Sequence, residues 1–261
     1  MKNAACLLTS SLALAVDTAA ASAERIDFDD LAHGTVVSTQ YQASHGLTIS
    51  ANNPHRHFDL AAAFDSNLSN TRDPDLESPW SGGNLPANTD LGTLLIIQEN
   101  NRDANNDGIL DRPDDEGRRP GGSLTFDFDR TLDSFGFTLV DVEGTPEYPG
   151  GFFMAIFRDA QQLATIDFKD LVERDPSDPA AQSVYDAYAP GTHPVFGDRT
   201  ANAVRPVTTG QVGGGFNRVV LGFGGSGGVA DISYTVVPSP TAVGGGLVLM
   251  TALLIRRRRQ A

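Results

Sequence analysis

The chain has 261 residues, with 33 acidic and 19 basic side chains and a formal net charge of −14 at neutral pH. This excess of carboxylates disfavours nucleic acid and anionic membrane surfaces as partners, because both are negatively charged. The length suits one sizeable core, and single β-sandwiches of roughly 200 residues are common.

Residues 1–23 have the pattern of a secretory signal peptide. Lys2 supplies a positive charge, residues 4–16 are apolar and mostly small, and Ala21 and Ala23 are the small residues that signal peptidase requires. We therefore expect a signal helix that is removed by cleavage before Glu24. A transit peptide is the alternative, although such segments are rich in arginine.

The mature chain is expected to contain no disulfide, because the one cysteine, Cys6, lies inside the signal segment. Removing Lys2, Asp17 and the four arginines at 256–259 leaves 14 basic and 32 acidic residues, a net charge of −18. Such a body is suited to binding cations, and metal would add to the stability of its core.

Residues 24–236 are expected to form one all-β domain. Residues 124–128 alternate apolar and polar side chains, as a half-buried strand does, and residues 135–139 repeat the pattern. Short strands between Gly, Pro, Asn and Asp turns indicate an antiparallel β-sandwich, and their number favours a jelly roll. The expected strands are 25–28, 35–41, 47–50, 94–98, 123–129, 132–142, 152–158, 162–168, 203–208, 217–223 and 229–236.

Two long stretches, 52–92 and 169–200, do not fit as strands. They are rich in Asn, Asp, Pro and Gly or in Pro, Asp and Ala, and residues 180–188 suggest a short helix. Loops of this length are usually functional or mobile.

The strongest candidate site is an acidic loop that resembles the first half of a calcium loop. Oxygen-bearing side chains alternate along it and Gly108 permits a sharp turn, an arrangement that suits one hard cation. The twelfth position is an aspartate where an EF-hand has a bidentate glutamate, and no flanking helices are evident. A solvated loop without metal is the alternative. The predicted calcium ligands are Asp103, Asn105, Asp107, Asp111, Asp114 and Asp115.

Two further acidic groups are candidate metal sites. One contains Asp65, Asp73 and Asp75; the other combines Asp29 with Asp231, since the first and last strands of such domains are often neighbours. Ordinary turn chemistry is the alternative for each, because aspartate favours turns.

Other patterns carry weaker signals. Ser226 stands in a literal G-x-S-x-G run, but a nucleophile elbow requires a following helix and here a strand is expected. His55 and His57, with Asp59, lack a third histidine nearby in sequence for zinc. The carboxylates offer no distinct pair for glycoside hydrolysis. Trp80, in a loop, is a candidate platform for a sugar, or it plugs the end of the domain.

The C-terminal segment 237–261 has three parts in a fixed order. Val237, Pro238, Ser239 and Pro240 are followed by an apolar run, 241–255, and then by Arg256, Arg257, Arg258 and Arg259. A helix of this run spans only ~22 Å, against a hydrocarbon core of roughly 30 Å. The basic end favours the cytoplasmic side. A plain tail anchor is the alternative reading.

This tail resembles the PEP-CTERM sorting signal of Gram-negative bacteria that make exopolysaccharide, with Ser239 where the common motif has glutamate. The resemblance implies a short transmembrane helix, transient anchoring in the inner membrane, cleavage by an exosortase-type protease, and transfer to the cell surface or extracellular matrix. The body also resembles the ectodomains of surface proteins that carry this tail, which implies a jelly-roll domain similar to carbohydrate-binding modules. That second resemblance rests on residues 26–31, 34–37, 46–50, 64–66, 73–76, 94–99, 113–116 and 224–231.

We therefore expect an exported, calcium-stabilised, non-enzymatic protein that binds extracellular polysaccharide. A secreted polysaccharide hydrolase that uses loop carboxylates and a purely structural matrix component are the alternatives.

Overall fold

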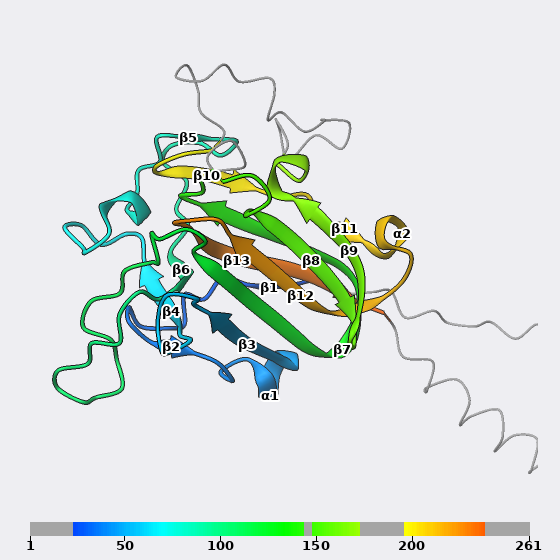
Figure 1. The fold of residues 1–261 in the computed structure, drawn as a ribbon, viewed down its shortest axis with the longest axis horizontal. Helices are drawn as coiled ribbons and strands as arrows, with labels where there is room; N and C mark the ends of the chain where they lie inside the picture. The colour runs from blue at the N-terminus through cyan, green and yellow to red at the C-terminus, as the bar shows by residue number, and fades with distance from the viewer. Residues whose placement is uncertain (1–22, 144–147, 173–195, 238–261) are drawn as a thin grey trace, which may run out of the picture. The chain divides into compact units, whose positions relative to one another are not determined.

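The computed structural model describes residues 23–143, 148–172 and 196–237, which belong to one compact unit, Ser22–Val237. The expectation of an all-β body is confirmed, because mostly antiparallel strands join in one network of pairings (Figure 1). The predicted signal helix, C-terminal helix and helix 180–188 lie outside the described residues. Within those that are described, no helix has the length and apolar character needed to cross a membrane.

The described elements are mainly short strands. The strands are β1 (Ala23–Ile26), β2 (Val36–Val37), β3 (Leu47–Asn52), β4 (Ala61–Asp65), β5 (Gly82–Gly83), β6 (Thr93–Ile97), β7 (Gly122–Val140), β8 (Phe153–Arg158), β9 (Gln161–Asp167), β10 (Thr200–Ala203), β11 (Val207–Thr208), β12 (Phe216–Phe223) and β13 (Gly228–Val236). Four short helical segments accompany them: α1 (Gln42–His45), η1 (Pro74–Leu76), η2 (Phe168–Asp170) and α2 (Thr209–Val212).

Strand β7 organises the fold. Two separate strands were expected here, but 19 residues run as one strand. Its first part pairs with β3 and β12, and its second part pairs with β13, β10 and β11. A single long strand thus pairs with other strands on both sides in each of its two parts.

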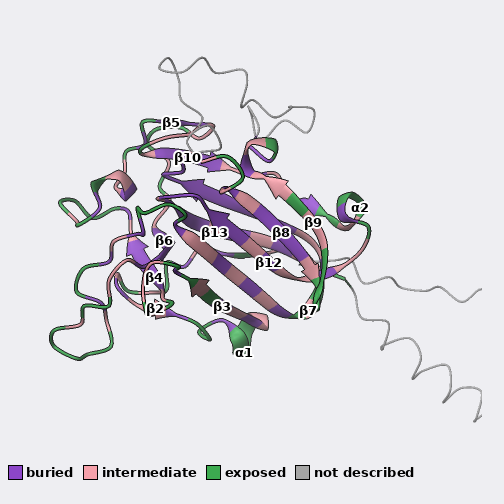
Figure 2. Cartoon of the chain, in the orientation of Figure 1, coloured by how far each residue is buried: buried purple, intermediate pink, exposed green. Residues whose placement is uncertain are grey.

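The main core contains the apolar faces of these strands. The predicted alternation is confirmed for 124–128, because Leu124, Phe126 and Phe128 are buried while the residues between them are partly exposed. For 135–139 it is wrong, since neighbouring strands cover both faces there and even Thr138 is buried. The Phe126 and Phe135 rings, from the two parts of β7, lie 5.6 Å apart between centroids. Figure 2 shows the resulting stripes of burial along β7 and β12.

A second, smaller apolar cluster includes Phe64, Leu94 and Val140. The prediction that the stretch 52–92 contains no strand is wrong, since β4 and β5 lie within it and β4 pairs with β2 and β6. Three consecutive alanines give β4 little strand propensity. Its burial comes from tertiary packing, because Ala61 to Phe64 are all almost fully covered.

Two other expected strands are shorter than predicted. The run 35–41 contributes only β2 and then leads into α1. The run 203–208 is divided into β10 and β11 around Pro206, which has no backbone N–H to donate to a ladder.

Candidate functional site

Three buried aspartates from distant parts of the chain meet in the structure. Asp73 caps η1 and accepts a hydrogen bond from the Asp75 amide at 3.2 Å. Asp115 pairs with Gln98, directly after β6, in an isolated bridge, and Asp141 follows β7 with a left-handed φ of 58°. Their exposed fractions are only 8%, 6% and 3%, respectively.

Ser226 connects two of these carboxylates. Its hydroxyl oxygen lies 2.8 Å from Oδ2 of Asp115 and 2.6 Å from Oδ2 of Asp141. A hydroxyl has one proton to donate, so it satisfies only one of two ionised carboxylates. Asp73 also lies within hydrogen-bonding reach of Asp115, and two carboxyl groups share a hydrogen bond only when one of them is protonated. If all three aspartates are ionised, the cluster therefore has too few protons for its contacts.

The electrostatics of the cluster lead to the same conclusion. Burial, followed by the charges of Asp73 and Asp141, raises the pKa of Asp115 well above its usual range. Burial raises the pKa of Asp141 to about 8, although Ser226 and a backbone amide donate to it. Burial also raises the pKa of Asp73. At neutral pH these groups keep protons or need a cation.

Basic side chains do not supply that cation. Among the described residues, no arginine, lysine or histidine forms an ion pair with Asp73, Asp115 or Asp141. Arg72 lies beside the cluster but approaches Asp114, at 3.6 Å. The pKa of Asp114 is raised to about 7 by burial and then by the Glu99 and Asp73 charges.

The donor atoms of this cluster are all oxygen, the type that calcium prefers. In their described positions, however, no three acidic or imidazole side chains anywhere in the described chain are placed to hold one metal ion. Ligation of calcium therefore requires the carboxylates to move from their hydrogen-bonded positions.

The predicted acidic loop is divided in two. Asp114 and Asp115 lie at the buried cluster. The side chains of segment 103–111 instead form hydrogen bonds within that segment. The two carboxylate oxygens of Asp103 accept from the amides of Asp107 and Gly108 at 3.2 and 3.0 Å. Asp111 accepts from the Ala104 amide at 2.7 Å, and Asn105 donates to Asp107 at 2.9 Å.

The other predicted acidic groups also separate. Asp73 and Asp75 lie at the buried cluster, but Asp65 accepts from the Asn67 amide in a local turn. The first and last strands are neighbours as expected, since β1 pairs with β13. Arg25 nevertheless contacts Asp231 at 2.8 Å, and Asp29 accepts from the Thr93 amide at 2.8 Å.

Trp80 is not available as a sugar platform. Its exposed fraction is 2%, it packs in the second apolar cluster, and its indole N–H donates to the Thr89 carbonyl at 2.9 Å. The loop tryptophan plugs the domain, which was the alternative reading of the sequence.

The G-x-S-x-G run and the His55–Asp59 segment show no catalytic or zinc-binding arrangement in the described residues. Ser226 lies between β12 and β13, so the G-x-S-x-G run is followed by a strand and not by a helix. A ring nitrogen of His55 lies 2.9 Å from the Pro120 carbonyl oxygen, and Asp59 accepts from the Asn53 amide at 2.8 Å.

Sequence reasoning missed Asp141 and the contacts of Ser226. Asp141 ends a long apolar strand, and Ser226 stands in a run of glycines, so neither resembles a site by spacing. One signal was present: an aspartate directly after a buried strand has to satisfy its carboxylate inside the protein.

Comparison with known proteins gave no match: no protein-family model, curated protein or solved structure is similar to this chain.

Proposed function

We propose that this chain is an exported surface or matrix protein of a Gram-negative bacterium, a non-enzymatic β-sandwich that calcium stabilises and that binds extracellular polysaccharide. The observation that carries the proposal is the buried cluster of Asp73, Asp115 and Asp141 around Ser226. Its carboxylates are buried and adjacent, and they have too few protons for their contacts if all three are ionised. A divalent cation relieves their mutual repulsion.

Calcium fits this role because its oxygen ligands tolerate irregular geometry. When calcium binds, the carboxylates give up their shared protons, so calcium affinity rises with pH. Asp73, Asp115 and Asp141 would supply the charged ligands, and Ser226 and the neighbouring Asp114 would lie close to the ion. The loop 103–111 is a second candidate, since carboxylate oxygens that accept one amide retain a further lone pair.

Calcium titration of two matched variants identifies the ligands. We expect isothermal titration calorimetry of Asp115→Asn to show loss of the strongest calcium site, because the fully buried carboxylate is removed. Asp103→Asn, the same substitution in the exposed loop, should keep that site. The reverse outcome would assign the strong site to the loop, and wild-type protein without any calcium heat would contradict the proposal.

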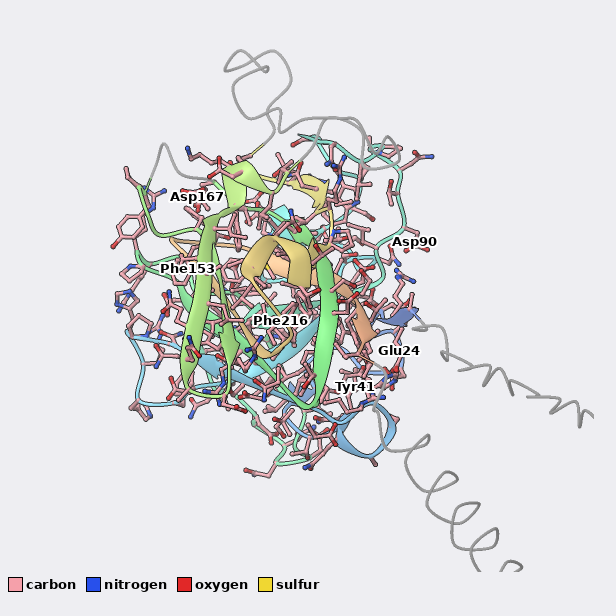
Figure 3. All side chains as sticks on the ribbon, turned by 90° about the vertical axis from the view of Figure 1, so that its right-hand side faces the viewer. Glu24, Tyr41, Asp90, Phe153, Asp167 and Phe216 are labelled. Atoms are coloured by element: carbon pink, nitrogen blue, oxygen red, sulfur yellow. The ribbon has the colours of Figure 1, made fainter. Side chains whose placement is uncertain are left out.

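The predicted cleavage points lie, along the sequence, next to the first and last strands of the described domain. Ala23, before the predicted cleavage point, lies opposite Thr235, two residues before Val237. Figure 3 labels Glu24, which lies in β1. Its carboxylate accepts from the Tyr234 hydroxyl at 2.7 Å and lies 3.0 Å from Nδ1 of His45. Burial opposes ionisation, but these hydrogen bonds and Arg130 together lower the pKa of Glu24. The first residue of the mature chain is thus held in the domain.

Mass spectrometry of protein recovered from the cell surface checks this processing. We expect an N-terminus at Glu24 and a C-terminus near Pro240, because the exosortase-type protease would remove the apolar run and the arginines. Ala21→Phe should block signal cleavage, whereas Ser22→Phe, at the unconstrained middle position, should not. Arg256 to Arg259 retained on surface protein would rule out the processing scheme.

The enzyme and structural alternatives make different predictions. Asp73 and Asp115 are almost completely covered, so a polysaccharide does not reach them in this conformation. A glycan array separates a binding protein from a purely structural one. Turnover of an array ligand would favour a hydrolase instead.

A further inference from the structure

We propose that a pocket beside the carboxylate cluster binds a carboxylate-bearing sugar, a uronic acid residue of an acidic polysaccharide. The pocket has a volume of about 360 Å³ and lies between the loop before η1 and the segment after the acidic loop. Pockets of roughly 300 Å³ and above hold small ligands, so a sugar residue fits. The residues that the argument uses are His33, Asn70, Thr71, Arg72, Asp111 and Arg112. The assignment specifies the ligand of the proposed polysaccharide binding and rests on it.

The charge of the pocket is opposite to that of the protein. The chain has 33 acidic and 19 basic residues, yet this pocket contains two arginines against a single aspartate. A positive pocket on an acidic protein is expected to bind an anionic sugar with higher affinity than a neutral one.

Arg112 is the principal anion-binding group. Its backbone carbonyl accepts hydrogen bonds from the side-chain amides of Asn100, at 2.8 Å, and Gln98, at 3.2 Å. These bonds fix the main chain at the pocket wall. Among the described residues, its guanidinium forms no hydrogen bond or ion pair. A guanidinium presents paired N–H donors that match a carboxylate. Arg72, whose side chain is 64% exposed, adds a second positive charge while it lies 3.6 Å from Asp114.

His33 supplies a neutral donor. Its Nδ1 accepts from the Asp65 amide at 3.1 Å, so in the uncharged ring the proton is on Nε2. Burial lowers the pKa of His33, which keeps the ring uncharged at neutral pH. The ring is fixed edge-on against Phe64, with 5.2 Å between centroids. Such a donor suits a sugar hydroxyl.

Asp111 and the loop residues complete the recognition of a sugar. Asp111 accepts from Ala104 through one oxygen, which leaves lone pairs for a hydroxyl donor. Asn70 adopts a left-handed φ of 59° at the pocket rim, and Thr71 is held by Glu77 at 2.8 Å. Donors for a carboxylate and an acceptor for hydroxyls therefore line one pocket, as a uronic acid requires.

The test is calorimetric titration of the intact, processed protein with trigalacturonate, with neutral galactotriose, and with inorganic phosphate. Calcium is held constant, and each titration is repeated in EDTA because uronates bind calcium themselves. We expect trigalacturonate to bind, galactotriose to bind at least roughly tenfold more weakly, and added salt to weaken binding. Phosphate that binds as tightly as trigalacturonate would show an anion site without sugar specificity and would overturn the assignment.

Variants locate the site. Arg112→Ala should weaken trigalacturonate binding roughly tenfold or more, because a charge-assisted contact is lost. Arg112→Lys should recover only part of it, since lysine cannot bind a carboxylate through two N–H groups. Arg118→Ala removes an exposed arginine six residues away and should change nothing. An unchanged affinity in Arg112→Ala, with an unchanged melting temperature to show that it folds, would refute the pocket.

Failure of this inference is distinguishable from failure of the calcium proposal. Calcium binding and calcium-dependent melting are measured without sugar. A protein that calcium stabilises but that does not bind trigalacturonate loses only the pocket assignment.

Discussion

The calcium-free protein is expected to lose stability as the pH rises from 6.5 to 8.5, and millimolar calcium is expected to remove that loss. Asp115 and Asp141 have folded-state pKa values above their unfolded values, about 8 for Asp141. An acid whose pKa is raised on folding does not affect stability below its unfolded pKa, where both states are protonated. Its contribution becomes unfavourable as the pH passes the unfolded value, and the cost is complete above the folded value.

The chosen pH range isolates this effect. Glu24 has a lowered pKa, so the stability that it contributes is lost only below roughly pH 4. His33 has a lowered pKa, so its effect has the opposite sign, a gain of stability with rising pH, and is nearly complete at roughly pH 6.5, the ordinary histidine value. The carboxylates with raised pKa values, including Asp114 at about 7, therefore dominate between pH 6.5 and 8.5.

The expected size of the effect is large. Each unit of pKa difference corresponds to about 1.4 kcal/mol, so the ionised cluster costs on the order of a few kcal/mol. Calcium at about 100 times its dissociation constant returns about 2.7 kcal/mol, which raises the melting temperature by roughly 5–10 °C. Thermal unfolding in EDTA and in calcium, at several pH values, measures both.

The matched variant is Asp141→Asn. Because it removes one of the repelling charges, it should flatten the pH dependence in EDTA and reduce the calcium response. Asp170→Asn, at an exposed position, should leave both unchanged. A wild-type melting temperature that calcium does not alter at pH 8.5 would count against a calcium site, and a flat pH profile in EDTA would count against the raised pKa values.

Replacement of Phe135 by alanine is expected to cost about 3–5 kcal/mol, the usual loss for a fully buried aromatic ring. Phe135 is 0% exposed and its ring centroid lies 5.6 Å from that of Phe126 and 6.2 Å from that of Phe128. The ring therefore joins the two parts of β7. Since small domains are stable by only about 5–15 kcal/mol, the variant should be close to unfolding.

Urea denaturation at constant calcium measures this loss. Phe153→Ala is the control, because Phe153 is only partly buried on β8 and should cost clearly less. A loss below roughly 1 kcal/mol at Phe135 would mean that the core does not depend on the contact between the two parts of β7.

The sequence by itself determined the local features of the protein. Alternation along 124–128 gave the buried face of the first part of β7, because the period of a strand is visible in the order of its side chains. Along 135–139 the same pattern predicted one exposed face, but both faces are buried there. The pairing of the first and last strands was also expected and is observed. The acidic excess and the segments with calcium-like spacing were evident without a fold.

Only the tertiary structure decided which acids meet. Spacing grouped Asp115 with Asp103 and grouped Asp73 with Asp65, because proximity along the chain was the only available distance. Folding instead brings Asp73, Asp115 and Asp141 together around Ser226, across up to 153 positions of the chain. The same is true of β4, whose alanines become a strand only because β2 and β6 pair with it. Long-range pairing and burial are properties of the assembled sheet, and they set the pKa values that no local pattern encodes.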